Sequence, residues 1–127
     1  MRNRLCLCLV VSFAISLIIV TQSYAFEITI DVSPKVLNLN SNSEVVTVHT
    51  DIKYSDVDAS SISLNGIFIE SYKSDDRGYF VAKFDSEQIK KLALIVNDYN
   101  TLRLEGTTKD NVSFWGEEDI LVINKGK

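Results

Sequence analysis

The segment YKSDDRGYFVAKFD, residues 72 to 85, places acidic side chains and a glycine between two runs rich in aromatic and β-branched residues. Asp75 and Asp76 could ligate a metal, because carboxylate oxygens are the ligands that Ca²⁺ prefers. In an EF-hand-like loop that ends at the glycine, the first, third and fifth positions are Lys73, Asp75 and Arg77. Two of these three are cations, which repel Ca²⁺. The spacing therefore predicts a hairpin tip without a metal or other cofactor, and leaves Asp75 and Asp76 as weak metal candidates.

The remaining polar candidates do not form a recognisable catalytic set. His49 is the sole histidine, and no serine stands in the G-x-S-x-G context of a nucleophile elbow. A zinc site built on one histidine without cysteines would need carboxylates to complete it. Asp56 and Asp58 could pair for acid/base chemistry, but their Ser-rich surroundings are typical of a solvated turn. The sequence therefore predicts a protein that is not an enzyme, with His49 on the solvent face of a strand.

Trp115 is the first of three aromatic candidates for binding. In VSFWGEED, Phe114 and Trp115 point to opposite faces of a regular strand, so one belongs to the core and the other is covered or exposed. An exposed Trp115 could stack on a sugar ring. Alternatively, Trp115 covers one end of the core, since aromatic side chains mostly serve packing.

Phe68 and Tyr72 are the other two candidates. They share one face of an expected strand with Glu70, and each stands about 7 Å from Glu70 along it, the rise over two residues. Ile67 and Ile69 take the opposite face, which is the better core candidate. Two aromatics flanking a carboxylate would form a recognition stripe, unless a neighbouring loop covers them.

The N-terminus has the layout of a secretory signal peptide. MRNR supplies two arginines, LCLCLVVSFAISLIIV is uncharged and apolar, and TQSYA ends with small residues at Ser23 and Ala25. This pattern predicts a signal peptide over residues 1–25 and a mature domain over residues 26–127, periplasmic or secreted and free of the membrane after cleavage. The alternative is a retained anchor, because the apolar span approaches the roughly 20 residues that cross a bilayer.

Charge and cysteine content restrict the mature domain further. The 127 residues include 13 basic and 17 acidic residues, for a net charge of −4. Removing the leader takes away Arg2 and Arg4 but no acid, and a more acidic domain without a basic cluster excludes nucleic acid as a partner. Cys6 and Cys8 also lie in the leader, so a domain of about 100 residues must be held by its hydrophobic core alone.

Period-two alternation dominates the mature chain and predicts strands in FEITIDV, VLNLN, EVVTVHTDI and TLRLEGTT. Pro34 ends the first strand. Asn65 and Gly66 predict a tight hairpin, and KYSDVDASS reads as a polar loop. One helix is expected in FDSEQIKKLALIV, where Asp85 can act as N-cap. The apolar face of that helix consists of Ile89, Leu92, Ala93 and Val96.

About seven short strands, at spacings of roughly 8 to 12 residues, predict an all-β antiparallel sandwich. The segments IDVSPKVLNLNSNSEVVTVHT, DVDASSISLNG, DDRGYFVAKFDSEQIKKL and LRLEGTTKDNVSFWGEEDILVI resemble exported bacterial immunoglobulin-like domains, whose pattern ends in L-x-G-x-x-x-D-G-x-x-F-x-G-x-D-x-I-x-V. The resemblance covers nearly all of the mature chain and implies an immunoglobulin-like topology with one short helix. Its motifs are turn and core positions, so it implies a fold more than an activity.

Together these patterns predict a noncatalytic exported module with a structural or protein-interaction role and an envelope protein as its partner. The alternative is a carbohydrate-binding or adhesin-type domain that uses exposed aromatics.

Overall fold

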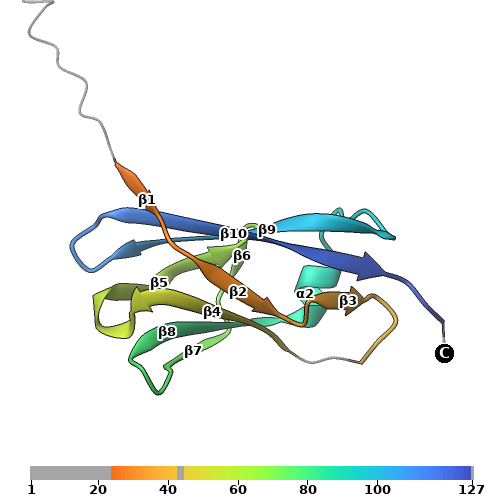
Figure 1. The fold of residues 1–127 in the computed structure, drawn as a ribbon, viewed down its shortest axis with the longest axis horizontal. Helices are drawn as coiled ribbons and strands as arrows, with labels where there is room; N and C mark the ends of the chain where they lie inside the picture. The colour runs from red at the N-terminus through yellow and green to blue at the C-terminus, as the bar shows by residue number, and fades with distance from the viewer. Residues whose placement is uncertain (1–23, 43–44, 127) are drawn as a thin grey trace, which may run out of the picture.

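The computed structural model describes residues 24–42 and 45–126. They form two β-sheets that pack against each other (Figure 1). Sheet A has six strands in the order β1-β10-β9-β5-β6, with β3 also paired to β10. Its strands are β1 (Ala25–Glu27), β3 (Val36–Asn38), β5 (Val57–Leu64), β6 (Ile67–Phe68), β9 (Asp98–Thr108) and β10 (Ser113–Ile123).

Sheet B has four strands in the order β2-β4-β8-β7. They are β2 (Ile30–Ser33), β4 (Val45–Lys53), β7 (Ser71–Ser74) and β8 (Tyr79–Asp85). The predicted all-β class with two packed sheets is confirmed. The prediction of purely antiparallel pairing is wrong, because β1 and β3 both pair with β10 in parallel, and the described residues form ten strands where about seven were expected. The predicted signal peptide lies outside the described residues except for its last two, Tyr24 and Ala25. No helix in the described ranges is long and apolar enough to cross a membrane.

The first predicted strand is two strands that belong to different sheets. Its alternation was interpreted correctly, because Ile28, Ile30 and Val32 are all buried. However, β1 pairs with β10 in parallel, whereas β2 pairs with β4. Figure 1 shows the chain passing from the layer of β10 to the layer of β4 between these two strands. Crossing between sheets preserves the alternation, since both sheets bury the side that faces the common core.

Glu118 of β10 binds the backbone of β2 near the end of that strand. Its side chain accepts a hydrogen bond of 2.9 Å from the backbone N–H of Val32. The ammonium of Lys35 binds both Glu118 and Asp31, and these hydrogen bonds, first the one to Asp31, raise the pKa of Lys35 above its ordinary value. Because Val32 is fully buried, this N–H would otherwise lack a partner at the point where the two sheets separate.

The long strand β4 is central in sheet B, as predicted, with β2 and β8 on either side. Its pairing with β8 shifts in register between His49 and Lys53. Within this irregularity the buried hydroxyl of Thr50 donates a hydrogen bond of 2.6 Å to the carbonyl of Phe80. A side chain thus satisfies a carbonyl at the place where the ladder is irregular.

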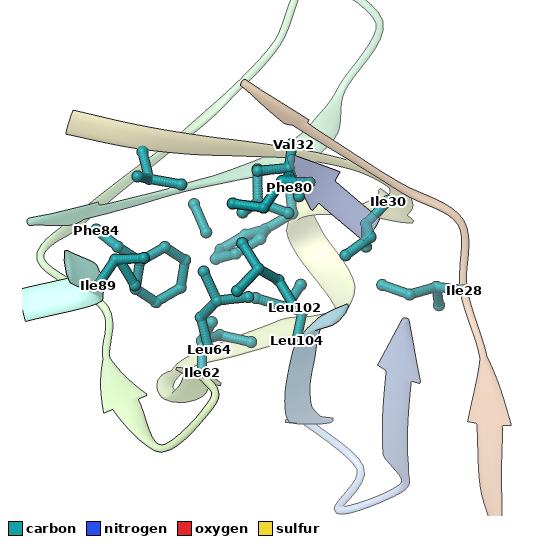
Figure 2. Close-up of a cluster of buried hydrophobic side chains, with 14 of the residues drawn as sticks. Ile28, Ile30, Val32, Ile62, Leu64, Phe80, Phe84, Ile89, Leu102 and Leu104 are labelled. Carbon is teal, nitrogen blue, oxygen red and sulfur yellow. The ribbon is translucent and has the colours of Figure 1, made fainter. Parts of the chain in front are cut away.

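The core lies between the two sheets and extends along the whole sandwich. Figure 2 shows Phe84 and Ile89 at one end and Ile28 at the other. The largest fully buried side chains are Phe80, Phe84, Phe114, Leu37, Ile62, Leu64, Ile89, Leu102, Leu104 and Ile120.

The helix is much shorter than the sequence predicts. α2 spans Ser86–Lys90, and the carboxylate of Asp85 accepts a hydrogen bond from the N–H of Glu87 as an N-cap. Ile89 is buried as expected, but Ala93 and Val96 are exposed. The chain must leave the helical path early in order to reach β9, which begins at Asp98.

Two predictions about the segment before β6 have opposite outcomes. Asn65 and Gly66 form the tight turn of a hairpin, with positive φ angles of 48° and 85°, so the Asn-Gly prediction is confirmed. The prediction of a polar loop in KYSDVDASS is wrong for its second half, because β5 already begins at Val57. Tyr54–Asp56 form a 3₁₀ turn that leads into that strand.

Candidate functional site

The register of sheet A brings together two of the three predicted binding aromatics. Phe68 lies opposite Ser63, Ser63 opposite Glu105, and Glu105 opposite Trp115. Residues paired across neighbouring strands point to the same face. The chain neighbours of Ser63, Glu105 and Trp115 are buried, and those of Phe68 are partly buried against the core. The four therefore form a row across the outer face of sheet A, called here the Phe68–Trp115 row. Its ends are about 14 Å apart, which is three strand spacings.

Arg103 connects the middle of this face to Trp115. Its guanidinium carbon lies 4.3 Å from the centre of the Trp115 ring, a cation–π contact. The same guanidinium lies 3.4 Å from the carboxylate of Glu105 and 3.2 Å from that of Glu117. Arg103 thus contacts two carboxylates and an aromatic face, and its planar guanidinium can offer hydrogen bonds to a partner.

The orientation of Trp115 follows the predicted alternation. Phe114 is 2% exposed in the core, whereas Trp115 is half-buried on the outer face. The Trp115 ring does not close one end of the core, because it lies on the outer face of sheet A. The face of the ring that Arg103 covers is not open to a sugar, which leaves a stacking ligand only the rest of the ring.

Small residues form a shallow depression beside Trp115. A pocket of about 300 Å³ is lined by Trp115, Arg103 and Glu105 together with Ala25, Ser61, Ser63, Gly106, Thr107, Ser113 and Phe114. The hydroxyl of Ser61 accepts a hydrogen bond from the N–H of Thr107 and donates one to the carbonyl of Asp58. Ser61 therefore stabilises the irregular pairing of β5 with β9.

The predicted stripe of Phe68, Glu70 and Tyr72 on one strand is wrong. Phe68 ends β6 in sheet A, and Tyr72 belongs to β7 in sheet B. The chain changes sheet between them, since the N–H of Ile69 binds sheet A at Ile62 whereas that of Glu70 binds sheet B at Lys83.

The orientation of the two aromatics also differs. Phe68 is 74% exposed on the outer face, while Ile67 and Ile69 pack against the core as predicted. Tyr72 instead lies opposite the buried Ala82 and so faces the space between the sheets.

Tyr72 belongs to a cluster of three aromatic rings at the side of the sandwich. Its ring centre lies 5.9 Å from that of Phe80 and 6.3 Å from that of Tyr54. The rings of Tyr54 and Phe80 are 6.1 Å apart. Two further tyrosines lie outside this cluster: Tyr79 contacts Arg77, and Tyr99 lies on β9. Neither this cluster nor the position of Arg103 has a local signal in the sequence.

The Asp75 carboxylate has a structural role in the hairpin tip. One oxygen accepts hydrogen bonds of 2.8 Å from the N–H of Arg77 and 2.9 Å from the N–H of Tyr79. The hydrogen bond from the Tyr79 N–H is the main cause that holds the pKa of Asp75 below its ordinary value of 3.8. The hydrogen bond from the Arg77 N–H and the positive charge of Arg77 lower this pKa further. Asp76 is exposed beside it. Residues 24–42 and 45–126 contain no group of three or more potential metal ligands.

The lowered pKa predicts an effect of pH on the Asp75→Asn variant. The unfolded state binds a proton at Asp75 more readily than the folded state, so the contribution of this carboxylate to stability is complete above its ordinary pKa. It is lost as the pH falls through the lowered value. We expect the variant to unfold at lower urea concentration than the wild type at neutral pH, with the difference narrowing as the pH falls below the ordinary pKa of 3.8. Asp76→Asn is the control, and a constant difference across this range would contradict the assignment.

Comparison with protein-family models, curated proteins and solved structures finds no match for this chain. A function is therefore inferred from two features, the outer face of sheet A and the cluster of Tyr54, Tyr72 and Phe80.

Proposed function

We propose that the protein is a noncatalytic, exported protein-interaction module that binds its partner through the outer face of sheet A. The observation that carries this proposal is the Phe68–Trp115 row with Arg103 beside it. Phe68 presents a 74% exposed aromatic ring, and Arg103 lies over the ring of Trp115 in a cation–π contact. Tryptophan and arginine are the residue types that most often dominate the energy of protein interfaces.

The strand order supports an immunoglobulin-like topology for this module. When β2, β4, β5, β7, β8, β9 and β10 are lettered A to G, sheet B has the order A-B-E-D and sheet A contains G-F-C. A constant-type immunoglobulin domain divides its strands in the same way, with A-B-E-D in one sheet and C-F-G in the other. The resemblance of the sequence to exported bacterial domains of this class supports the same topology. The signal-peptide pattern of residues 1–25 separately supports export. An envelope protein, in the periplasm or outside the cell, is the partner that such a location would provide.

A carbohydrate-binding or adhesin-type role is the second candidate. The hydroxyl groups of Ser63 and Thr107 line the depression beside Trp115, together with the Glu105 carboxylate. Hydroxyls, a carboxylate and an aromatic ring are suited to a sugar. The stacked guanidinium of Arg103 favours a protein partner, because it covers part of the ring that a sugar would need.

The test combines one substitution in the row with one at Arg103 beside it and compares two classes of partner. Phe68→Ser removes an exposed ring, so it should change the free energy of unfolding by less than about 1 kcal/mol. Together with Arg103→Ala it should weaken capture of an envelope protein by roughly 30-fold or more, as expected for the loss of a hot spot.

His49→Ser is the matched control, because His49 is exposed on the outer face of the other sheet. It should bind like the wild type. Equal capture by all variants would place the binding surface elsewhere. Retention of purified polysaccharide in place of protein, lost in the double variant, would support the carbohydrate role.

A further inference from the structure

We propose that the free edge of β7 binds an extended peptide in which an aromatic residue is flanked by acidic residues. This surface belongs to sheet B and is distinct from the Phe68–Trp115 row. Three features of the described residues lead to it, namely the backbone groups of β7, the aromatic pocket inside its edge and the lysines outside it.

The first feature is the direction of the β7 backbone groups. In the described part of the chain, β7 is the last strand of sheet B and pairs with β8 alone. The N–H of Asp75 binds the carbonyl of Tyr79, and hydrogen-bonded pairs alternate along an antiparallel ladder. The register then directs the N–H and C=O groups of Lys73 towards β8. Those of Tyr72 and Ser74 point to the open edge, where they can pair with an added strand.

The second feature is a pocket inside this edge. A volume of about 230 Å³ is lined by Tyr54, Tyr72 and Phe80 together with Val57, Asp58, Ala59 and Lys109. A residue opposite Tyr72 on an added strand would point to the same face as Tyr72 and so towards this pocket. The volume is smaller than the roughly 300–1,000 Å³ of small-molecule sites, and it suits one large side chain. Three rings already packed at about 6 Å favour an aromatic one.

The third feature is positive charge on the outer side of the same edge. Lys73 lies opposite Val81, and Lys83 lies opposite Ser71. Both lysines point away from the core, because the alternate residues Phe80, Ala82 and Phe84 are buried in it. None of the ion pairs found among the described residues involves either lysine. The residues that flank the aromatic one would lie beside these charges, so acidic side chains complement them.

A second copy of this chain fits the edge less well than such a peptide. If two β7 strands paired with Tyr72 opposite Ser74, Lys73 would stand opposite Lys73 of the other copy, which is unfavourable. If Tyr72 lay opposite Tyr72, each Lys73 would face Ser71 of the other copy. Neither arrangement supplies an acid to the lysines, and the edge is only four residues long.

The experiment uses the capped synthetic peptide TVEYEVT and the mature domain labelled with ¹⁵N. We expect shifts of the Tyr72 and Ser74 amide signals on titration, and binding at least tenfold weaker for TVKYKVT and for TVESEVT. In a protein with both Lys73→Glu and Lys83→Glu, the preference between TVEYEVT and TVKYKVT should reverse. The reversal would be hard to explain by a general loss of structure.

A backbone variant tests the pairing itself. Ser74→Pro removes an N–H that faces the open edge, which edge strands tolerate, and it should reduce binding strongly, whereas Ser74→Ala should bind normally. The proposal is overturned if the peptide leaves the β7 amides unchanged at millimolar concentration, or if the charge swap has no effect. Concentration-dependent dimers that perturb the same amides would assign the edge to a second copy instead. Phe68→Ser should not affect binding, so the outcome is independent of the surface proposed on sheet A.

Discussion

Replacing Phe84 with alanine is expected to lower the free energy of unfolding by about 3–5 kcal/mol, the usual cost of removing a buried aromatic ring. Phe84 is 0% exposed on β8 and packs at the end of the core that α2 closes, near Ile89 (Figure 2). The loss combines the transfer energy of the ring with the cavity that the surrounding side chains cannot fill. Since domains of this kind have a total free energy of unfolding of about 5–15 kcal/mol, the variant should lose a large fraction of its stability. Urea denaturation followed by tryptophan fluorescence would measure the change.

Phe68→Ala is the matched control for this prediction. The chemical change is identical, but Phe68 is 74% exposed, so the expected loss is less than about 1 kcal/mol. Similar losses in the two variants would mean that Phe68 is covered in solution. Such a result would also remove the main support for the outer face of sheet A as a binding surface.

Gly116→Ala is expected to destabilise the domain by about 1–3 kcal/mol, the range for overpacking a filled interior. A Cβ atom at this position would lie 2.8 Å from the carbonyl oxygen of Ile28 and 2.8 Å from Cγ2 of Ile30. The first of these neighbours is backbone and cannot rotate away. An alanine in an ordinary strand would instead gain roughly 0.5–1 kcal/mol over glycine, so the predicted effect has the opposite sign from the intrinsic one.

The requirement for glycine arises from the passage of the chain between the sheets. β1 and β2 are joined across the inner side of β10, and the N–H of Ile28 donates a hydrogen bond of 2.8 Å to the carbonyl of Trp115. Only a residue without a side chain allows this close approach. Gly126→Ala is the control, because a Cβ atom there would meet nothing within 4 Å. Equal midpoints for the two variants in thermal or urea unfolding would contradict the close packing of this crossing.

Local patterns in the sequence determined which side of most strands is buried, the segment from Phe68 to Tyr72 excepted. Alternation in β4 identified Val46 and Val48 as core residues and His49 as exposed, and the structure agrees. Asn65 and Gly66 specified a turn because few other residues adopt positive φ angles at low cost. Asp85 specified the start of α2 through its own side-chain hydrogen bond. Each of these outcomes depends on neighbours in the chain, which is why the sequence was sufficient.

Only the tertiary structure decided which sheet each strand joins. Alternation with period two is the same in both sheets, so it could not show that the chain changes sheet before Ile30 and again between Phe68 and Tyr72. The length of α2 was likewise set by the path to β9 and not by the apolar spacing that extended to Val96.

The candidate surfaces are products of the same long-range pairing. Phe68 and Trp115 share a row because β5 and β9 lie between their strands, and Arg103 reaches Trp115 across a strand boundary. Tyr54 and Tyr72 meet because β7 lies beside β8, which carries Phe80. Hydrogen bonds between residues distant in the chain fix these positions. The sequence alone therefore supplied the aromatic and charged side chains, and the pairing of the strands decided which of them act together.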